Sequence, residues 1–381
     1  MQKDKNKSKK SFLLIVILFV LVALMTCVLI STLKKSKTGV ETSSDRIVGT
    51  DNTSLEKTLL TTNNLGSSRL TSTEAERLTT INKNLSQKNF FGAFVGVKNN
   101  KILFSAKFGY ANVQLRNVFR LDSNFIVGQY QNLINDALIL NLVKNGKLDL
   151  SSKVSTYIPG LKSSIKVKSL LTNSINLYAK SSVVNDISNG EANKADLKNI
   201  STSAYSKYVL ANSSLKKVLI AKANKTTYAQ AIDALFVENL NLQNTRALIS
   251  DSFQANDVRS YKNSVESGES VQQNEVDTGD LYLNQYNLRM SLSDILLSMS
   301  GILRNRLFVQ KYDHLFDMAI NSEQGISSSS KVITVNTKAY GQYVSVMTND
   351  STGKIAVSVS NYPNKKVNVQ KLNKSIFDLL N

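Results

Sequence analysis

The stretch FIVGQYQNLINDALILNLVKNGKLDL, residues 125–150, decides the fold of this chain. Its apolar side chains recur at helical spacing, and further apolar residues widen the stripe until little polar face remains. The recurring positions are Tyr130, Leu133, Ile134, Ala137, Leu138 and Leu142. A helix that is apolar on most sides is normally buried inside a large domain. Gly146 supplies a left-handed stop, so the sequence predicts a core helix that ends there.

The composition excludes several kinds of site. The chain has 381 residues, enough for a sizeable core, but only one Cys and one His. An intrachain disulfide and a Cys/His zinc cluster are therefore excluded, and we expect no cofactor. The one histidine, His314, lies in a helix-like segment, and we interpret it as a solvated or core residue rather than a catalytic base.

The N-terminal segment is expected to anchor the chain in a membrane. Residues 12–33 carry no charge, and 22 residues at about 1.5 Å per residue can span a bilayer. The Lys-rich residues 1–11 precede this run, and no small-x-small cleavage site follows it. Because the larger positive cluster is N-terminal, we predict an uncleaved, single-pass signal anchor with residues 1–11 in the cytoplasm and the C-terminal domain outside the cell.

The remaining chain divides into a linker and one domain. Residues 34–72 are rich in Ser, Thr, Asn and Lys and are predicted to be a flexible linker. The domain is predicted to span residues 73–381. Its first helix has the spacing of a capping box at Thr73 and Glu76.

The charge balance suits anionic partners. The formal net charge is +19, of which residues 1–37 supply +7 and the remainder +12. We expect an anionic cell-wall polymer, a peptidoglycan fragment or lipid head groups as partners. Nucleic acid is not expected, because no binding motif is present. The alternative is a diffuse surface charge with no specific partner.

Strand patterns occur at both ends of the domain. Residues 92–113 predict a hairpin that turns at Asn99 and Asn100. Near the C-terminus three segments are strand-like, and a closing helix is predicted for residues 371–380. The three segments are residues 331–336, 341–347 and 355–361. Residues 178–203 match no pattern, and residues 251–277 predict a long loop.

The order of residues in the core helix resembles the nucleophile helix of serine β-lactamases and penicillin-binding proteins, in particular class C β-lactamases and D-Ala-D-Ala carboxypeptidases. That branch reads Phe-x-x-Gly-Ser-x-x-Lys, an apolar helix, then Gly-Lys-Leu-Asp-Leu. The matching residues are Phe125, Gly128, Leu142, Gly146, Lys147, Leu148, Asp149 and Leu150. Gln129 stands at the Ser position and Asn132 at the Lys position.

Two further catalytic motifs of this superfamily have degenerate counterparts. In the second motif, Tyr-x-Asn, Tyr208 fits the Tyr and Leu210 replaces the Asn; a rival register begins at Tyr205. The third motif, Lys-Thr-Gly or His-x-Gly, falls on Val335, Asn336 and Thr337.

Other landmarks of the superfamily follow in order. Residues 165–177 resemble a Leu-Leu-x-His-x-Ser-Gly-Leu tract, with Asn173 at the His position. Residues 240–245 resemble Leu-Gly-Met-x-Asn-Thr. A later landmark, Ser-Thr-Ala-x-Asp-Leu at the start of an apolar helix, allows two registers, with Asn287 or Asp294 at its Asp.

The resemblance implies an α/β (α+β) fold of the β-lactamase and transpeptidase type. An antiparallel sheet from both chain ends would be flanked by helices and an all-α region, and one transmembrane helix would precede the domain. In this superfamily a Ser oxygen attacks the carbonyl, and the Lys one helical turn later serves as its base. Gln129 has no nucleophilic oxygen, and Asn132 cannot act as a base near neutral pH.

Three hypotheses follow. The first is a membrane-anchored pseudoenzyme that binds a cell-wall component or an envelope partner at the vestigial cleft. The second is an active serine hydrolase on peptidoglycan or teichoic-acid esters, with Ser174 or Ser206 as candidate replacement nucleophiles. The third is an envelope scaffold with no ligand in the cleft. The missing base favours the first over the second.

Overall fold

The computed structural model describes residues 55, 58–59, 65–66, 69–161, 164–189, 194–248, 253–261, 286–329, 331–362 and 365–380. The predicted anchor and most of the predicted linker lie outside these residues. No helix in the described part of the chain is long and apolar enough to cross a membrane. Leu55, Leu59 and Leu65, from the predicted linker, are buried in the main core of the domain.

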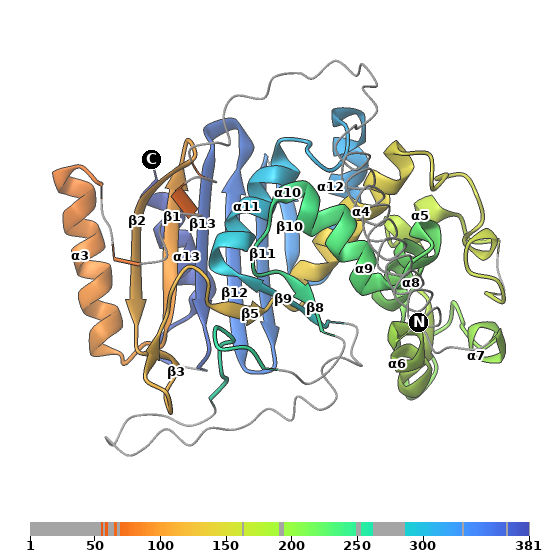
Figure 1. Cartoon of the computed structure of the whole chain (residues 1–381), viewed down its shortest axis with the longest axis horizontal. Helices are drawn as coiled ribbons and strands as arrows, with labels where there is room; N and C mark the ends of the chain where they lie inside the picture. The colour runs from red at the N-terminus through yellow and green to blue at the C-terminus, as the bar shows by residue number, and fades with distance from the viewer. Residues whose placement is uncertain are drawn as a thin grey trace, which may run out of the picture. The chain divides into compact units, whose positions relative to one another are not determined.

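A six-stranded antiparallel sheet joins the two ends of the domain (Figure 1). The strand order is β10-β11-β12-β13-β1-β2, so that β1 pairs with β13. The N-terminal strands are β1 (Gly92–Lys98) and β2 (Lys101–Phe108). The C-terminal strands are β10 (Ile326–Ser329), β11 (Val332–Ala339), β12 (Gln342–Asn349) and β13 (Lys354–Ser360). The predicted sheet built from both chain ends is confirmed.

The turn between β1 and β2 lies where the sequence predicts it. Asn99 and Asn100 have φ angles of 49° and 61°. Both are left-handed, the conformation that two-residue hairpin turns require and that Asn tolerates well.

Side chains of the central strands alternate between two hydrophobic cores. In β1, Phe94 belongs to the smaller core, whereas Ala93 and Val95 belong to the main core. This follows from the period of two that points successive side chains to opposite faces. The smaller core is closed by α3 (Ser72–Gln87) and α13 (Val369–Asp378), and the main core by α4 (Tyr130–Lys144) and α11 (Leu292–Leu303). The sheet is therefore covered by helices on both faces.

The start of α3 corrects one prediction. The capping box is formed by Thr71 and Glu74, not by Thr73 and Glu76. The Thr71 N–H and hydroxyl both donate to the Glu74 carboxylate, at 3.1 and 2.7 Å. Thr-x-x-Glu occurs in two overlapping registers here, and the motif alone does not choose between them. The closing helix predicted for residues 371–380 is confirmed as α13.

An all-α region lies beside the sheet, on the right in Figure 1. Besides α4 it contains α5 (Val167–Leu171), α6 (Ser181–Asn189), α7 (Lys194–Lys198), α8 (Asn212–Asn224), α9 (Tyr228–Ile232) and α10 (Glu238–Leu240). Helix α12 (Asp313–Asn321) packs against α4 and β10. Single turns occur at η1 (Val154–Thr156), η2 (Asp233–Val237), η3 (Gln310–Tyr312) and η4 (Asp350–Thr352).

Three small sheets complete the described part of the domain. They pair β3 (Tyr110–Asn112) with β4 (Asn117–Val118), β6 (Tyr178–Lys180) with β7 (Tyr208–Leu210), and β5 (Asn124–Ile126) with β9 (Leu288–Ser291), which also pairs with β8 (Arg246–Ala247). Residues 178–203, which match no sequence pattern, thus include β6, α6 and α7. Of the predicted loop at 251–277, the described residues 253–261 contain neither helix nor strand.

Helix α4 is the predicted core helix, and almost all of its side chains are buried. Gly146 follows its C-cap with φ 69°, which confirms the predicted left-handed stop. Gln129 immediately precedes its first turn. The fold therefore places the predicted nucleophile position at the N-terminus of a helix buried on nearly all sides.

Helix α11 agrees with the second of the two registers for the late landmark. Its N-cap is Ser291, and Asp294 lies in its first turn. The buried Asp294 carboxylate accepts hydrogen bonds from the Gln243 and Asn244 N–H groups and from the Thr245 hydroxyl. Asp294 thereby ties α11 to residues 240–245.

Candidate functional site

Gln129 and Thr337 form two hydrogen bonds with each other at the N-terminal end of α4. The Gln129 N–H donates to the Thr337 hydroxyl oxygen at 3.0 Å, and the Thr337 hydroxyl donates to the Gln129 side-chain carbonyl. Gly128 has φ 52°, and a Cβ there would lie 2.1 Å from the Thr337 oxygen. Glycine is thus required at 128, because β11 approaches the helix this closely.

Asn132, one turn further along α4, is held by a carboxylate. Its side-chain N–H donates to Glu323 Oε2 at 2.7 Å, and the residue is 2% exposed. Glu323 follows the end of α12, and its other oxygen accepts from Asn173 at 2.7 Å. Asn173 in turn accepts from the buried Asn212 at the start of α8, at 2.8 Å. The two positions that would carry the nucleophile and base are therefore both engaged in hydrogen bonds.

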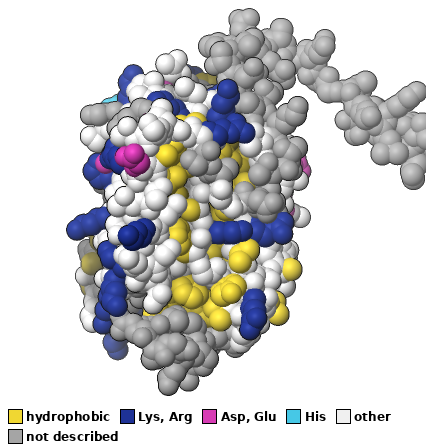
Figure 2. Space-filling view, turned by 90° about the vertical axis from the view of Figure 1, so that its left-hand side faces the viewer, with side chains coloured by type: hydrophobic (Ala, Val, Ile, Leu, Met, Phe, Trp, Pro, Cys, Tyr) yellow, Lys and Arg dark blue, Asp and Glu magenta, His cyan; other side chains and the backbone are white. Residues whose placement is uncertain are grey.

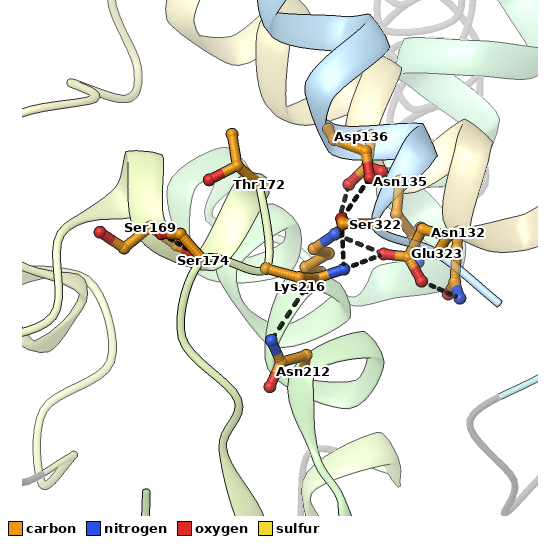
Figure 3. Close-up of polar contacts among 12 residues, drawn as sticks. Asn132, Asn135, Asp136, Ser169, Thr172, Ser174, Asn212, Lys216, Ser322 and Glu323 are labelled. Atoms are coloured by element: carbon orange, nitrogen blue, oxygen red, sulfur yellow. Dashed lines mark hydrogen bonds and ion pairs between the residues drawn. The ribbon is translucent and has the colours of Figure 1, made fainter. Parts of the chain in front are cut away.

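A lysine does lie in this cluster, but it comes from α8 rather than α4. The Lys216 ammonium lies 2.7 Å from both Asp136 Oδ1 and Glu323 Oε1 (Figure 3). Lys216 and Asp136 are fully buried. We call Asn132, Asp136, Asn173, Lys216 and Glu323 the cleft cluster.

The electrostatics of the cleft cluster keep Lys216 charged. Burial alone would lower the pKa of Lys216, but the adjacent carboxylates of Asp136 and Glu323 outweigh burial and raise it. Burial raises the pKa of Asp136 to about 7, against the attraction of Lys216, and the neighbouring Glu323 carboxylate adds to the rise. The Lys216 ammonium thus forms ion pairs with two carboxylates. Because it has no lone pair to accept a proton, it cannot act as a base.

A second buried lysine, Lys217, is the next residue of α8 and has different partners. Its Nζ donates to Asn287 Oδ1 at 3.1 Å and lies 5.0 Å from the centre of the Tyr228 ring. Burial lowers the pKa of Lys217 to about 7. Tyr228 donates to Asn135 at 2.7 Å and accepts from Gln131 at 3.0 Å. This second network joins α8 to α4 beside the cleft cluster.

The structure brings together only some of the predicted site residues. Gln129, Asn132 and Thr337 lie at one end of α4, and Val335 is buried in the main core on the same face of β11 as Thr337. Tyr208 and Leu210 lie on β7, which pairs with β6. Within the described residues, no hydrogen bond links those two to Gln129, Asn132 or Thr337.

The remaining candidates of the sequence analysis lie on the surface. Ser174 is exposed, and its hydroxyl is 3.4 Å from the Ser169 carbonyl oxygen. Ser206 is exposed, as is His314 on α12. Among the described residues, no group of three His, Cys, Asp or Glu side chains could hold a metal ion.

The sequence analysis missed Asp136, Lys216 and Glu323. The sequence nevertheless pointed to Asp136, because it is the one acidic residue of a helix predicted to be buried, and a buried charge requires a partner. No comparable pattern identifies Lys216 or Glu323 as that partner.

Comparison with known proteins agrees with this architecture. A family model described as Beta-lactamase matches residues 76–328, more than half of the chain. No curated protein matches the sequence at a significant level.

Similar solved structures cover nearly the whole domain. FmtA from Staphylococcus aureus superposes with a TM-score of 0.64 at 22% identity, over 86% of this chain and 96% of that chain. A penicillin-binding protein from Bacillus halodurans superposes with a TM-score of 0.61 at 14% identity, over 78% of this chain and 100% of that chain. A β-lactamase/D-alanine carboxypeptidase from Pseudomonas syringae superposes with a TM-score of 0.57 at 15% identity, over 81% of this chain and 99% of that chain. At these identities the likeness shows the fold.

Proposed function

The chain belongs to the β-lactamase family, and we propose that it is a member that forms no acyl-enzyme at Gln129. It would act instead as a membrane-anchored binding protein for an anionic component of the cell envelope. The observation that carries the first half is the pair of hydrogen bonds between Gln129 and Thr337.

These hydrogen bonds occupy a group that acyl transfer needs free. In serine hydrolases the N–H of the nucleophilic residue commonly donates to the oxyanion that forms during attack. Here that N–H, on Gln129, already donates to Thr337 at 3.0 Å. One donor of an oxyanion hole is worth about 10²–10³ in rate. The proposed inactivity therefore rests on geometry as well as on the absent serine.

Proton transfer is also unsupported at this position. Asn132 replaces the Lys of the superfamily, and its amide cannot take a proton near neutral pH. Lys216 does not substitute for it, because the Asp136 and Glu323 carboxylates hold the ammonium in its charged form. Nucleophile, base and oxyanion donor are thus compromised by three separate residues.

The binding half of the proposal rests on charge and on the expected anchor. The chain after residue 37 carries a formal charge of +12. On the face formed by α3 and β2, Lys and Arg side chains are spread widely while acidic ones are sparse (Figure 2). The uncharged residues 12–33 with their Lys-rich N-terminal flank favour an external position for the domain. An anionic wall polymer at the outer face of the membrane suits both features.

Intact-mass spectrometry of the full chain after incubation with penicillin tests the chemistry. We expect no adduct on the unmodified protein. A catalytically active penicillin-binding protein in the same incubation serves as the positive control. An adduct of the drug's mass would overturn the proposal in favour of an active hydrolase, and peptide mapping to Ser174 or Ser206 would identify the nucleophile.

Retention of the full chain on purified wall polymer at increasing salt tests the binding. Exposed charges are screened within about 8 Å at physiological ionic strength, so binding should weaken steeply with salt. Retention that salt leaves unchanged, or no retention at low salt, would contradict the electrostatic contact. The second outcome would favour an envelope scaffold.

Protease added to wall-less cells tests the orientation. We expect intact cells to lose the domain, because it should lie outside the membrane. Cleavage only after lysis would contradict an external domain.

A further inference from the structure

A cavity distinct from the cleft lies beneath the β3–β4 hairpin. It has a volume of about 410 Å³, and its lining includes Arg116, Arg120, Asp122, Asn256 and Asp257. We call it the hairpin pocket. It shares no residue with the cleft cluster, and the inference below does not depend on the proposed loss of acylation.

Arginine is concentrated around this pocket. The chain has ten Arg residues, far fewer than its Lys residues, yet five of the ten gather here. Arg116 and Arg120 line the cavity, and Arg246 and Arg289 approach its wall at Asp257. The backbone N–H of Arg259 donates to Ala111, and its guanidinium lies over the Phe253 ring. Arginine presents a planar fork of N–H donors that matches the oxygens of phosphate and carboxylate. Its concentration at one place therefore points to an anionic ligand.

In the described part of the chain, two aspartates form ion pairs with these arginines. Asp122 accepts from Arg120 at 3.2 Å, and Asp257 lies 2.6 Å from Arg246 and 3.9 Å from Arg289. Among the described residues, these two aspartates are the carboxylates within ion-pair distance of the five arginines. This group of five arginines and two aspartates is thus richer in basic than in acidic side chains, whereas the cleft cluster has two carboxylates for one ammonium.

Two of the arginines have unused donors. The Arg116 side chain, on the exposed loop of the hairpin, makes no hydrogen bond or ion pair with any other described residue. The Arg289 side chain is 2% exposed, and its Nε and Nη1 find no hydrogen-bond partner in the described part of the chain. Burial lowers the pKa of Arg289 to about 10, against the attraction of Asp257. A buried guanidinium with free N–H groups is costly unless an anion or water is supplied.

The hairpin also exposes apolar side chains beside the arginines. Leu115 is 67% exposed, Val118 39% and Tyr110 36%. Basic side chains next to exposed apolar ones are typical of a surface that contacts a membrane with anionic head groups. A free anion would explain the arginines but not the apolar tip.

We propose that the hairpin pocket binds the phosphate of an anionic membrane lipid, with Arg116 and Arg120 donating to it and Leu115 entering the lipid interface. The phosphate supplies the negative charge that Asp122 and Asp257 do not. Residues 12–33, the predicted anchor, would keep the domain close to such a surface.

The absence of Trp from the chain allows a direct test with a single reporter. Leu115→Trp places a fluorophore at the hairpin tip, and Met318→Trp places one on α12, where Met318 is 45% exposed. Each full-length variant is reconstituted into phosphatidylcholine vesicles with and without phosphatidylglycerol. We expect the emission of the Leu115→Trp variant to move to shorter wavelength only when phosphatidylglycerol is present, and the emission of the Met318→Trp variant not to respond.

Charge variants in the Leu115→Trp background make the test specific. Arg116→Gln with Arg120→Gln should abolish the shift, whereas Lys83→Gln with Lys153→Gln, an equal loss of charge at other exposed sites, should retain it. An equal response of the Met318→Trp variant, or a shift that survives loss of both arginines, would overturn the proposal. If soluble poly(glycerol phosphate) or inorganic phosphate, but not the lipid, gave the arginine-dependent spectral change, the assignment to a membrane lipid would be wrong.

Discussion

The cleft cluster and the hairpin pocket hold charge in opposite ways. In the cleft cluster, the buried Lys216 lies 2.7 Å from each of two carboxylates, and neighbouring amides bind both oxygens of Glu323. In the hairpin pocket, Arg116 is exposed without a side-chain partner among the described residues, and Arg289 retains unused donors. The first region pairs its charged groups with one another, and the atoms it leaves without a partner among the described residues are acceptors, Asn132 Oδ1 and Asp136 Oδ2. The second has spare donors, as a binding site has. The position of the superfamily's motifs therefore does not decide where this chain binds a ligand.

Removing the charge at the centre of the cleft cluster should have the largest effect. Lys216→Met leaves the Asp136 and Glu323 carboxylates buried without a counter-charge, and breaking a buried pair in this way costs about 3–5 kcal/mol of unfolding free energy. Denaturant unfolding measures the loss. Lys222→Met, at an exposed position on the same helix, is the control and should stay within about 0.5 kcal/mol. A loss below about 1 kcal/mol for Lys216→Met would show that the cluster does not hold the cleft closed.

Lys217 should make the unfolding free energy depend on pH above neutrality. Its folded pKa of about 7 lies below the ordinary value of 10.5, so between these values the unfolded chain holds a proton that the folded chain lacks. Stability should therefore rise with pH from about 7 to 10, by roughly 1 kcal/mol per pH unit. The difference between wild type and Lys217→Met, measured by unfolding at several pH values, isolates this contribution. Parallel curves for the two proteins would contradict the buried, neutral amine.

Asn212→Ala should have an intermediate effect. The Asn212 side chain donates to Asn173 at 2.8 Å and accepts from the Leu177 N–H at 2.8 Å. Leaving these buried groups without a partner costs about 1–3 kcal/mol. Asn84→Ala, on the exposed side of α3, is the matched control. Equal melting curves for the two variants would mean that the hydrogen bonds of Asn212 add nothing to the stability of the cleft cluster.

Arg116→Gln should have the smallest effect on stability and so sharpen the contrast between the regions. An exposed side chain without a partner contributes within about 0.5 kcal/mol. The same substitution, combined with Arg120→Gln, is expected to abolish the lipid response. A loss of stability comparable with that of Lys216→Met would show that Arg116 is structural.

The sequence predicted the parts of the fold that depend on local pattern. The buried helix α4, its stop at Gly146, the turn at Asn99 and Asn100 and the C-terminal strands all follow from periodicity or turn chemistry, which neighbouring residues determine. The order of motifs then led to the superfamily. The capping box of α3 was misplaced by two residues because the pattern fits twice.

The sequence did not predict how the site is filled. Lys216 is 80 residues from Asp136 and 107 from Glu323, and no period connects such positions. The same holds for Gln129 and Thr337, which are 208 residues apart. Both were identified as vestigial positions, but the hydrogen bonds between them depend on how closely β11 approaches α4.

The acylation rate of a repaired chain tests the central claim most directly. Gln129→Ser with Asn132→Lys restores the nucleophile and its base, and this double variant is compared with the same chain carrying Thr337→Ala. Thr337→Ser, which keeps the hydroxyl, is the matched control, and melting curves confirm that each variant folds. We expect the Thr337 hydroxyl to accept a hydrogen bond from the N–H at position 129 and so to keep that N–H from the oxyanion. Penicillin should then acylate the chain with Thr337→Ala about 10²-fold faster than the double variant alone or the double variant with Thr337→Ser. Equal rates for all three, measured as the growth of the adduct mass, would contradict the account.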